Sequence, residues 1–190
     1  MIIGITGGTG CGKTTLLNVI RDQGGIILDC DEIYHELLCT DMTLLRAIEE
    51  RFPGTVENSV LQRKKLGAIV FGDKAALKDL NRITYRFILP AIEKKLTQPG
   101  KLKAIDAIGL FEGKLDRLCD VTVAVTAPEK SRVARLMERD QITEEYARSR
   151  IAAQRPQAEF AALCDYTLHN DSTREAFRAK CLSFLTQLGV

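Results

Sequence analysis

Short apolar runs alternate along this chain with longer segments in which apolar residues recur at helical spacing. The short runs are rich in β-branched side chains and therefore predict buried strands. They occupy residues 1–6, 26–29, 102–106, 121–125 and 166–168. Because helical segments separate these strands, the pattern predicts an α/β fold with a five-stranded parallel sheet flanked by helices.

Capping residues and helix breakers indicate where the helices begin and end. The helices are expected at residues 13–21, 32–38, 41–52, 59–72, 73–96, 128–139, 143–154 and 172–188. Pro90 should kink or interrupt the long helix at 73–96. Ser172 and Glu175 fit the S-x-x-E capping box at the start of the last helix.

A single domain over residues 1–190 is expected, because the chain is short for two full domains. Its core should consist of residues 1–58, 97–127 and 157–190. Residues 59–96 contain no predicted strand and should form a helical insertion that binds a substrate. Residues 128–156 contain two arginine-rich helices joined by a tight turn and should form a lid.

The composition is typical of a soluble globular protein. Apolar residues make up 45% and charged residues 27%, and no apolar run approaches the ~20 residues of a membrane span. The first residues lack the basic and apolar regions of a secretion signal, so a cytoplasmic location is expected. The six cysteines form no C-x-x-C pair, which argues against a metal centre or a disulfide framework.

The net charge of +2 gives no reason to expect nucleic-acid binding, but the charge is unevenly distributed. Residues 60–103 contain eleven Lys or Arg and three Asp or Glu. Such a basic segment suggests a site for an anionic ligand, with Arg63 and Arg82 as candidate contacts. A solvated helix face would give the same composition, so both interpretations stay open.

A phosphate-binding motif lies between the first predicted strand and the first predicted helix. The segment Gly7-Gly8-Thr9-Gly10-Cys11-Gly12-Lys13-Thr14 fits G-x-x-x-x-G-K-[ST]. Its glycines allow successive N–H groups to face a phosphate, and the helix that follows adds the positive end of its dipole. The alternative is a glycine-rich turn that binds nothing, and the complete motif between strand and helix argues against it.

The motif assigns roles to individual residues. A nucleoside triphosphate is expected to contact Gly8, Thr9, Gly10, Cys11, Gly12, Lys13, Thr14 and Thr15. Lys13 is a catalytic candidate because its ammonium should reach the β- and γ-phosphates, and the Thr14 hydroxyl should hold Mg²⁺. Cys11 is expected to fill a loop position as a small residue rather than to act as a reactive thiol.

Two predicted strands end in acidic residues, Asp29 with Asp31 after the second strand and Asp106 after the third. In open parallel sheets, ligands bind at the carboxyl ends of the strands. These carboxylates are therefore expected to face the same crevice as the phosphate-binding motif.

Four segments together resemble the dephospho-CoA kinase family across nearly the whole chain. They are residues 4–14, Asp29-Cys30-Asp31, Leu110-Phe111-Glu112 and the run Arg135-Leu136-Met137-Glu138-Arg139-Asp140. The resemblance implies the fold of a P-loop nucleotide kinase. It also implies transfer of a phosphoryl group from ATP, with Mg²⁺, to the ribose 3′-hydroxyl of dephospho-CoA, the final step of coenzyme A synthesis.

The resemblance also implies roles for residues outside the phosphate-binding motif. Asp31 would deprotonate or orient the acceptor hydroxyl, and capping of the next helix by Asp31 is a compatible alternative. Arg139, with Arg135 as a second candidate, would close over the transferred phosphoryl group. Glu112 would have a structural or substrate-positioning role, and Tyr85 stands where the family often has His.

Two other classes of protein share part of this pattern. Another P-loop kinase, acting on a nucleoside or nucleoside monophosphate, would have the same motif, acid and lid. A regulatory NTPase that switches a partner would normally contain N-K-x-D if it used GTP, and this sequence lacks that motif. We therefore expect a kinase with a small-molecule substrate and with neither nucleic acid nor membrane as a partner.

Overall fold

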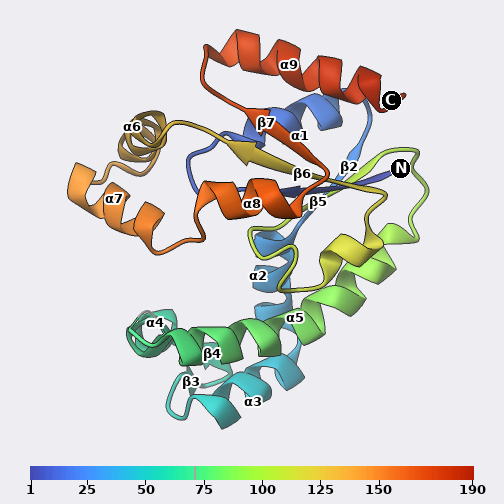
Figure 1. The fold of residues 1–190 in the computed structure, drawn as a ribbon. Helices are drawn as coiled ribbons and strands as arrows, with labels where there is room; N and C mark the ends of the chain where they lie inside the picture. The colour runs from blue at the N-terminus through green and yellow to red at the C-terminus, as the bar shows by residue number, and fades with distance from the viewer. Residues whose placement is uncertain (71) are drawn as a thin grey trace. The chain divides into compact units, whose positions relative to one another are not determined.

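The computed structural model describes residues 1–70 and 72–190, which form two compact units (Figure 1). The first unit comprises Met1–Ile27, Gly100–Leu110 and Asp116–Val190. The second unit comprises Leu28–Pro99 and Phe111–Leu115. Each has a hydrophobic core of its own, and no helix among the described residues is both long and apolar enough to cross a bilayer.

The five predicted strands are present and form one parallel sheet in the order β2-β5-β1-β6-β7. The strands are β1 (Ile2–Thr6), β2 (Ile26–Asp29), β5 (Lys103–Asp106), β6 (Val121–Thr126) and β7 (Tyr166–His169). Near the end of the central strand β1, Ile5 lies between Asp106 of β5 and Val123 of β6. The predicted α/β fold class is therefore confirmed.

Helices cover both faces of this sheet in the first unit (Figure 1). The helices of this unit are α1 (Lys13–Asp22), α6 (Glu129–Asp140), α7 (Glu144–Ala152), α8 (Gln157–Leu163) and α9 (Arg174–Gln187). Helices α6 and α7 pack on each other beyond one end of the strands. Helices α1 and α9 pack together on one face, where Leu16 and Phe177 are fully buried beside Ile5 and Val123. Helix α8 packs on β6 from the other face.

The second unit is mainly helical. It contains α2 (Cys30–Thr40), α3 (Met42–Arg51), α4 (Arg63–Val70), α5 (Lys74–Leu96) and the short strands β3 (Val56–Glu57) and β4 (Val60–Leu61). Leu44, Ile48, Phe52 and Leu66 are buried in its core. This unit is larger than the insertion expected at 59–96, because α2 and α3 pack on α5.

The prediction that the insertion contains no strand was wrong. Strands β3 and β4 form an antiparallel hairpin, and its turn residues Asn58 and Ser59 have positive φ angles of 49° and 63°. Two consecutive residues with positive φ angles form a tight turn whose twist matches that of the paired strands. Ser59 therefore belongs to a turn, and the helix expected from that position begins only at Arg63.

Helix α5 continues through Pro90, so the expected interruption does not occur. Proline removes one helical N–H and disfavours a helix interior. However, Ile83, Ile88 and Ile92 are buried on the two sides of Pro90. Ile83 belongs to the core of the second unit, and burial of these side chains offsets the local penalty.

Three helix caps lie where the sequence predicts them, with Asp41, Asp73 and Thr143 capping α3, α5 and α7. The last helix differs. The Thr173 hydroxyl, not that of Ser172, accepts a hydrogen bond from the Ala176 N–H at 3.2 Å. The capping box expected from Ser172 and Glu175 was therefore wrong by one residue.

Helix α8 was not predicted. Its N-cap is Pro156, which has no side-chain acceptor, so the sequence carries no capping signal there. The helix begins at Gln157, whose side-chain amide forms two hydrogen bonds with the backbone of Ala127, the residue after β6. Gln157 Oε1 accepts from the Ala127 N–H at 2.7 Å, and Gln157 Nε2 donates to the Ala127 carbonyl at 2.8 Å.

The cap of α9 gives a direct test of the local geometry. We expect Thr173→Ala to lower the free energy of unfolding by about 1 kcal/mol, because an N–H of the first helical turn loses its acceptor. Ser172→Ala is the matched control and should leave it nearly unchanged. Equilibrium urea denaturation measures both, and a larger loss for Ser172→Ala would contradict the observed cap.

Candidate active site

The phosphate-binding motif forms a loop between β1 and α1 in the first unit. Gly10 and Gly12 have φ angles of 75° and 101°, a region that favours glycine. A Cβ atom at Gly10 would lie 2.8 Å from the Arg132 carbonyl oxygen, and one at Gly12 would lie 2.2 Å from Asn170 Nδ2. Both positions therefore require glycine for backbone conformation and for close packing.

Cationic side chains hold the carbonyl groups of this loop. Lys13 Nζ donates to the Gly7 carbonyl at 2.8 Å. Arg132 Nε, from α6, donates to the Thr9 carbonyl at 2.9 Å. Because each peptide plane is rigid, fixing a carbonyl also fixes the direction of the N–H group in the same peptide.

Two further side chains act on the next part of the loop. Arg135 Nη1 donates to the carbonyls of Gly10 and Cys11, at 3.1 and 3.3 Å. Asn170 Nδ2, just after β7, donates to the Cys11 carbonyl at 2.9 Å. Arg135 was the second candidate for the lid, and in this structure its guanidinium binds the loop itself.

The N–H groups of the loop remain available to an anion. Among the described residues, no oxygen accepts a hydrogen bond from the N–H of Gly10, Gly12, Lys13 or Thr14. The first N–H groups of α1 have no intrahelical acceptor, and the helix dipole makes this end positive. The loop therefore has the donors that a phosphate chain requires, which fits the predicted nucleotide site.

The remaining motif residues have different surroundings. The Thr14 side chain is exposed, whereas the Thr15 N–H donates to the Gly12 carbonyl at 3.0 Å. Cys11 is 1% exposed, and burial raises the pKa of its thiol. Cys11 therefore fills a loop position as predicted, because a buried neutral thiol is a poor nucleophile.

Asp106 lies at the same edge of the sheet as the loop. It is the last residue of β5 and pairs in register with Ile5, just before the loop begins. Its negative charge acts on the Cys11 thiol and adds to the rise in the pKa of that group. An acidic side chain thus stands beside the start of the phosphate-binding loop, as the strand pattern predicts.

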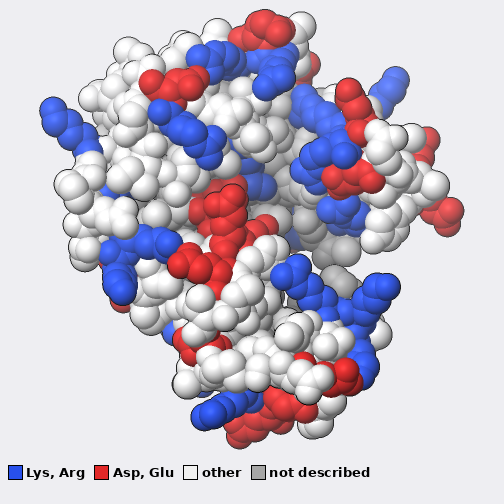
Figure 2. Space-filling view, turned by 180° about the vertical axis from the view of Figure 1, so that it is seen from behind, with Lys and Arg blue, Asp and Glu red and all other residues white. Residues whose placement is uncertain are grey.

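Arg139 has different partners from the other two arginines of α6. Its guanidinium donates to both carboxylate oxygens of Asp140 at 2.6 and 3.0 Å, and Arg150 of α7 donates to the same carboxylate at 2.5 Å. The Asp140 carboxylate raises the pKa of Arg139, and the Arg139 side chain is 60% exposed. Figure 2 shows acidic and basic side chains interspersed over α6 and α7. Arg139 thus belongs to a surface ion-pair cluster in this structure.

Asp29 and Asp31 have separate roles in the second unit. The Asp29 carboxylate caps α2 by accepting from the N–H groups of Asp31 at 2.8 Å and Glu32 at 3.2 Å. The suggestion that Asp31 caps this helix was therefore wrong. The Asp31 side chain is exposed, and within residues 1–70 and 72–190 Asp31 takes part in the α2 cap only through its backbone N–H.

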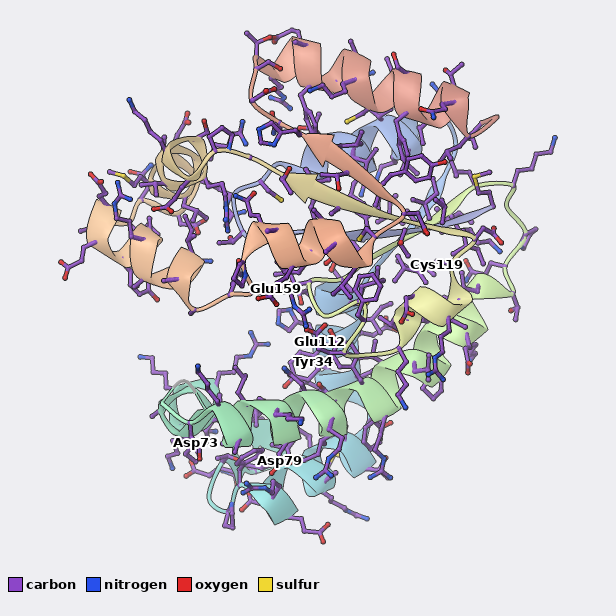
Figure 3. The ribbon with its side chains drawn as sticks, viewed as in Figure 1. Tyr34, Asp73, Asp79, Glu112, Cys119 and Glu159 are labelled. Carbon is purple, nitrogen blue, oxygen red and sulfur yellow. The ribbon has the colours of Figure 1, made fainter. Side chains whose placement is uncertain are left out.

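The basic segment of the second unit divides into two groups of side chains. Arg63 and Lys64 of α4 line a surface pocket of about 540 Å³, and basic side chains gather on this side of the unit (Figure 2). Arg82 instead pairs with Asp79 at 3.0 Å, and the same carboxylate pairs with Arg51 at 2.8 Å. Figure 3 places Asp79 on the first half of α5. Arg82 is therefore engaged in a structural ion pair, whereas Arg63 faces a pocket.

Tyr85 contacts the segment that contains Glu112. A Cβ atom at Gly113 would lie 2.4 Å from Tyr85 Cδ1, so the phenol ring packs directly on the Gly113 backbone. Both residues belong to the second unit, where Glu112 is labelled in Figure 3. Tyr85 thus supports the neighbourhood of Glu112 by packing, a role that needs no positive charge.

The sequence predicts no individual role for Arg132 or for Gln154, the last residue of the helix expected at 143–154. Gln154 Oε1 accepts from the Thr9 N–H at 2.7 Å, and Arg132 binds the carbonyl of the same residue. One available signal was the spacing of Arg132 and Arg135, because residues three apart share one face of a helix. Arg139 lies one turn further along α6 and has other partners.

Comparisons with known proteins agree with the resemblance found in the sequence. The family model for dephospho-CoA kinase matches residues 1–175. The dephospho-CoA kinase of Geobacillus kaustophilus is 36% identical over 197 residues, which cover 98% of this chain and 96% of that protein. The dephospho-CoA kinase of Lactobacillus acidophilus is 32% identical over 193 residues, which cover 98% of this chain and 96% of that protein.

A solved structure is similar over almost the same length. A protein from Thermus thermophilus matches with a TM-score of 0.81 and 28% identity, over 99% of this chain and 97% of that chain. The family match and the two relatives extend over nearly the whole sequence, including the phosphate-binding loop and the helices that follow β6. The chain therefore belongs to the dephospho-CoA kinase family.

Proposed function

We propose that this chain transfers the γ-phosphoryl group of ATP to the ribose 3′-hydroxyl of dephospho-CoA in the cytoplasm. The observation that carries the proposal is the loop at the start of α1, whose carbonyls are held by side chains while four N–H groups stay available. Such a loop binds a phosphate chain. Membership of the dephospho-CoA kinase family indicates that dephospho-CoA is the acceptor of the phosphoryl group.

The nucleotide and its metal ion would be held by residues of the first unit. The N–H groups of Gly10, Gly12, Lys13 and Thr14 would bind the phosphate chain. Lys13 Nζ would leave the Gly7 carbonyl to contact the terminal part of that chain. A Mg²⁺ ion bound through substrate phosphates needs only one or two protein oxygens, and the Thr14 hydroxyl is exposed for this purpose. The metal ion would neutralise charge on the phosphates during transfer.

Asp31 is proposed as the base or orienting group for the acceptor hydroxyl. Its carboxylate does not cap α2, because Asp29 occupies that position. An exposed carboxylate outside the protein's own hydrogen-bond network can accept a proton from a substrate hydroxyl. Because Asp29 is the cap, the exposed carboxylate of Asp31 stays accessible to a substrate, which supports the proposal for Asp31.

Arg139 and Arg135 are proposed as the cations that close over the transferred group. Arg139 would have to exchange Asp140 for phosphate oxygens, and its exposure allows that exchange. Arg135 already lies against the loop and would need a smaller movement. Closure of α6 and α7 as a lid would also exclude water, which otherwise competes with the acceptor hydroxyl for ATP.

The diphosphate of dephospho-CoA is proposed to bind the basic side of the second unit. Arg63 and Lys64 line a pocket there. Burial raises the pKa of Tyr34, and the positive charge of Arg63 opposes that rise, so Arg63 acts on the interior of this unit as well as on its surface. Glu112, with Tyr85 packed beside it, would help to position the acceptor.

Lys13→Ala should lower kcat by ~10² or more while the protein stays folded, because a fixed charge that stabilises the transition state is lost. Lys130→Ala is a matched control, since Lys130 is exposed on α6. Steady-state kinetics with ATP and dephospho-CoA measure the effect. Near-normal turnover of folded Lys13→Ala would remove the loop lysine from the mechanism.

Asp31→Asn should lower phosphoryl transfer by ~10² to 10⁴ with little change in ATP affinity, because the amide keeps the shape but cannot accept the proton. Its melting temperature should match the wild type, whereas Asp29→Ala should lose about 1 kcal/mol of stability as its cap disappears. A product assay with dephospho-CoA, AMP and a nucleoside as competing acceptors measures transfer. Preference for either rival acceptor would refute the proposed substrate, and a wild-type rate for Asp31→Asn would refute only the role of Asp31.

Arg63→Gln should raise KM for dephospho-CoA about tenfold, the equivalent of ~1.4 kcal/mol of lost binding, and leave KM for ATP unchanged. Arg82→Gln is the matched control on the same unit, because the Arg82 side chain is 73% exposed and its guanidinium is paired with Asp79. The two KM values, measured separately, distinguish the outcomes. Equal effects of the two variants would favour a solvated basic face over a substrate site.

A further inference from the structure

We propose that Arg132 is a positioning residue for nucleotide binding, whose buried positive charge is compensated only when phosphates occupy the loop. The inference rests on the proposed nucleotide site and adds a residue to it. It concerns the helix α6, which the sequence analysis assigned to a lid. Arg132 would act through the loop backbone and through its charge, without direct contact with the reacting atoms.

The guanidinium of Arg132 lies inside the protein against the loop. The residue is 3% exposed, and its Nε donates to the Thr9 carbonyl at 2.9 Å. Its Nη2 is buried and has no hydrogen-bond partner among the described residues. A Cβ atom at Gly8 would lie only 2.4 Å from this Nη2, so the unsatisfied donor is directed at the phosphate-binding loop.

The charge of Arg132 lacks a neighbouring carboxylate. No ion pair of Arg132 occurs within residues 1–70 and 72–190, and Glu129, the one acidic residue whose charge acts on it, pairs with Arg148 at 2.7 Å on the surface. Burial lowers the pKa of Arg132, which shows that the site disfavours an uncompensated cation. An isolated buried charge is costly in free energy unless an anion or several hydrogen bonds offset it.

The phosphates of a bound nucleotide are the anions that the proposed site supplies. They would sit against the N–H groups of the same loop that Arg132 holds from its carbonyl side. The contrast with Arg139 is informative, because Arg139 already has the carboxylate of Asp140. Of these two arginines on α6, Arg132 is the one whose positive charge is not neutralised by a carboxylate of the described residues.

A second contact makes the same position a link to the lid. Gln154, which follows α7, accepts a hydrogen bond from the Thr9 N–H at 2.7 Å. Thr9 is therefore held by its carbonyl from α6 and by its N–H from the end of α7. A Cβ atom at Gly8 would meet both Arg132 Nη2 and Gln154 Oε1, so these two groups converge on one peptide of the loop. Phosphate binding would strengthen this clamp.

The test compares charge with hydrogen-bond geometry at residue 132. We would measure ADP binding by calorimetry, without acceptor substrate, for the wild type, Arg132→Lys, Arg132→Gln and Arg132→Met. Melting temperatures without ligand show that each variant folds. Arg148→Gln is the matched control, since it removes an arginine from the lid surface, where Arg148 pairs with Glu129 and Glu144.

We expect Arg132→Gln and Arg132→Met to weaken ADP binding about tenfold or more, the size expected for one partly buried charge near a phosphate. Arg132→Lys keeps the charge but loses the fork of donors, so it should bind ADP better than Arg132→Gln. The control should bind ADP as the wild type does.

Arg132→Gln that binds ADP as well as Arg132→Lys, or variants that all match the wild type, would overturn the inference and leave Arg132 as a structural buttress. If Arg132→Met does not fold, the comparison of Lys with Gln still decides the question. Absence of ADP binding to the wild type would refute the proposed nucleotide site, an outcome distinct from failure of the role given to Arg132.

Discussion

The candidate site depends on the hydrogen bonds that side chains donate to the carbonyls of the phosphate-binding loop. The carbonyls of Gly7, Thr9, Gly10 and Cys11 are each bound by a side chain, so the adjoining peptides have fixed directions. A backbone N–H can serve an anion only if its peptide does not turn to satisfy the carbonyl instead. Side chains from α6 and from the end of β7 thus prepare the loop in advance, which lowers the reorganisation needed on binding.

The three arginines of α6 differ in burial and in the groups that bind their guanidinium. Arg132 is buried and has no carboxylate partner among the described residues. Arg135 donates hydrogen bonds to two loop carbonyls. Arg139 lies on the surface and pairs with Asp140. Charge in a low-dielectric interior acts more strongly than the same charge in water. A fixed inner cation would suit the proposed nucleotide binding, whereas an exposed one could move in the proposed closure of α6 and α7. One helix therefore supplies both kinds of charge.

Neighbouring residues of the same type also have different partners in the second unit. Asp29 holds the start of α2, which leaves the carboxylate of Asp31 outside that cap. Asp79 pairs with Arg51 and Arg82, while Arg63 remains beside a pocket. In both cases neighbouring residues of the same type have different roles, because hydrogen-bond geometry and ion pairing engage one of them and leave the other available.

The sequence by itself determined the five strands, the phosphate-binding loop and the caps of α3, α5 and α7, because these depend on residues close together in the chain. Only the tertiary structure decided which side chains serve the loop. Arg132 and Thr9 are 123 residues apart, and no local pattern indicates that they meet. The same holds for the continuation of α5 through Pro90, where burial of distant side chains outweighs local propensity. Local signals fix the five strands and the loop, whereas long-range packing selects the partners of each charge and maintains α5 through Pro90.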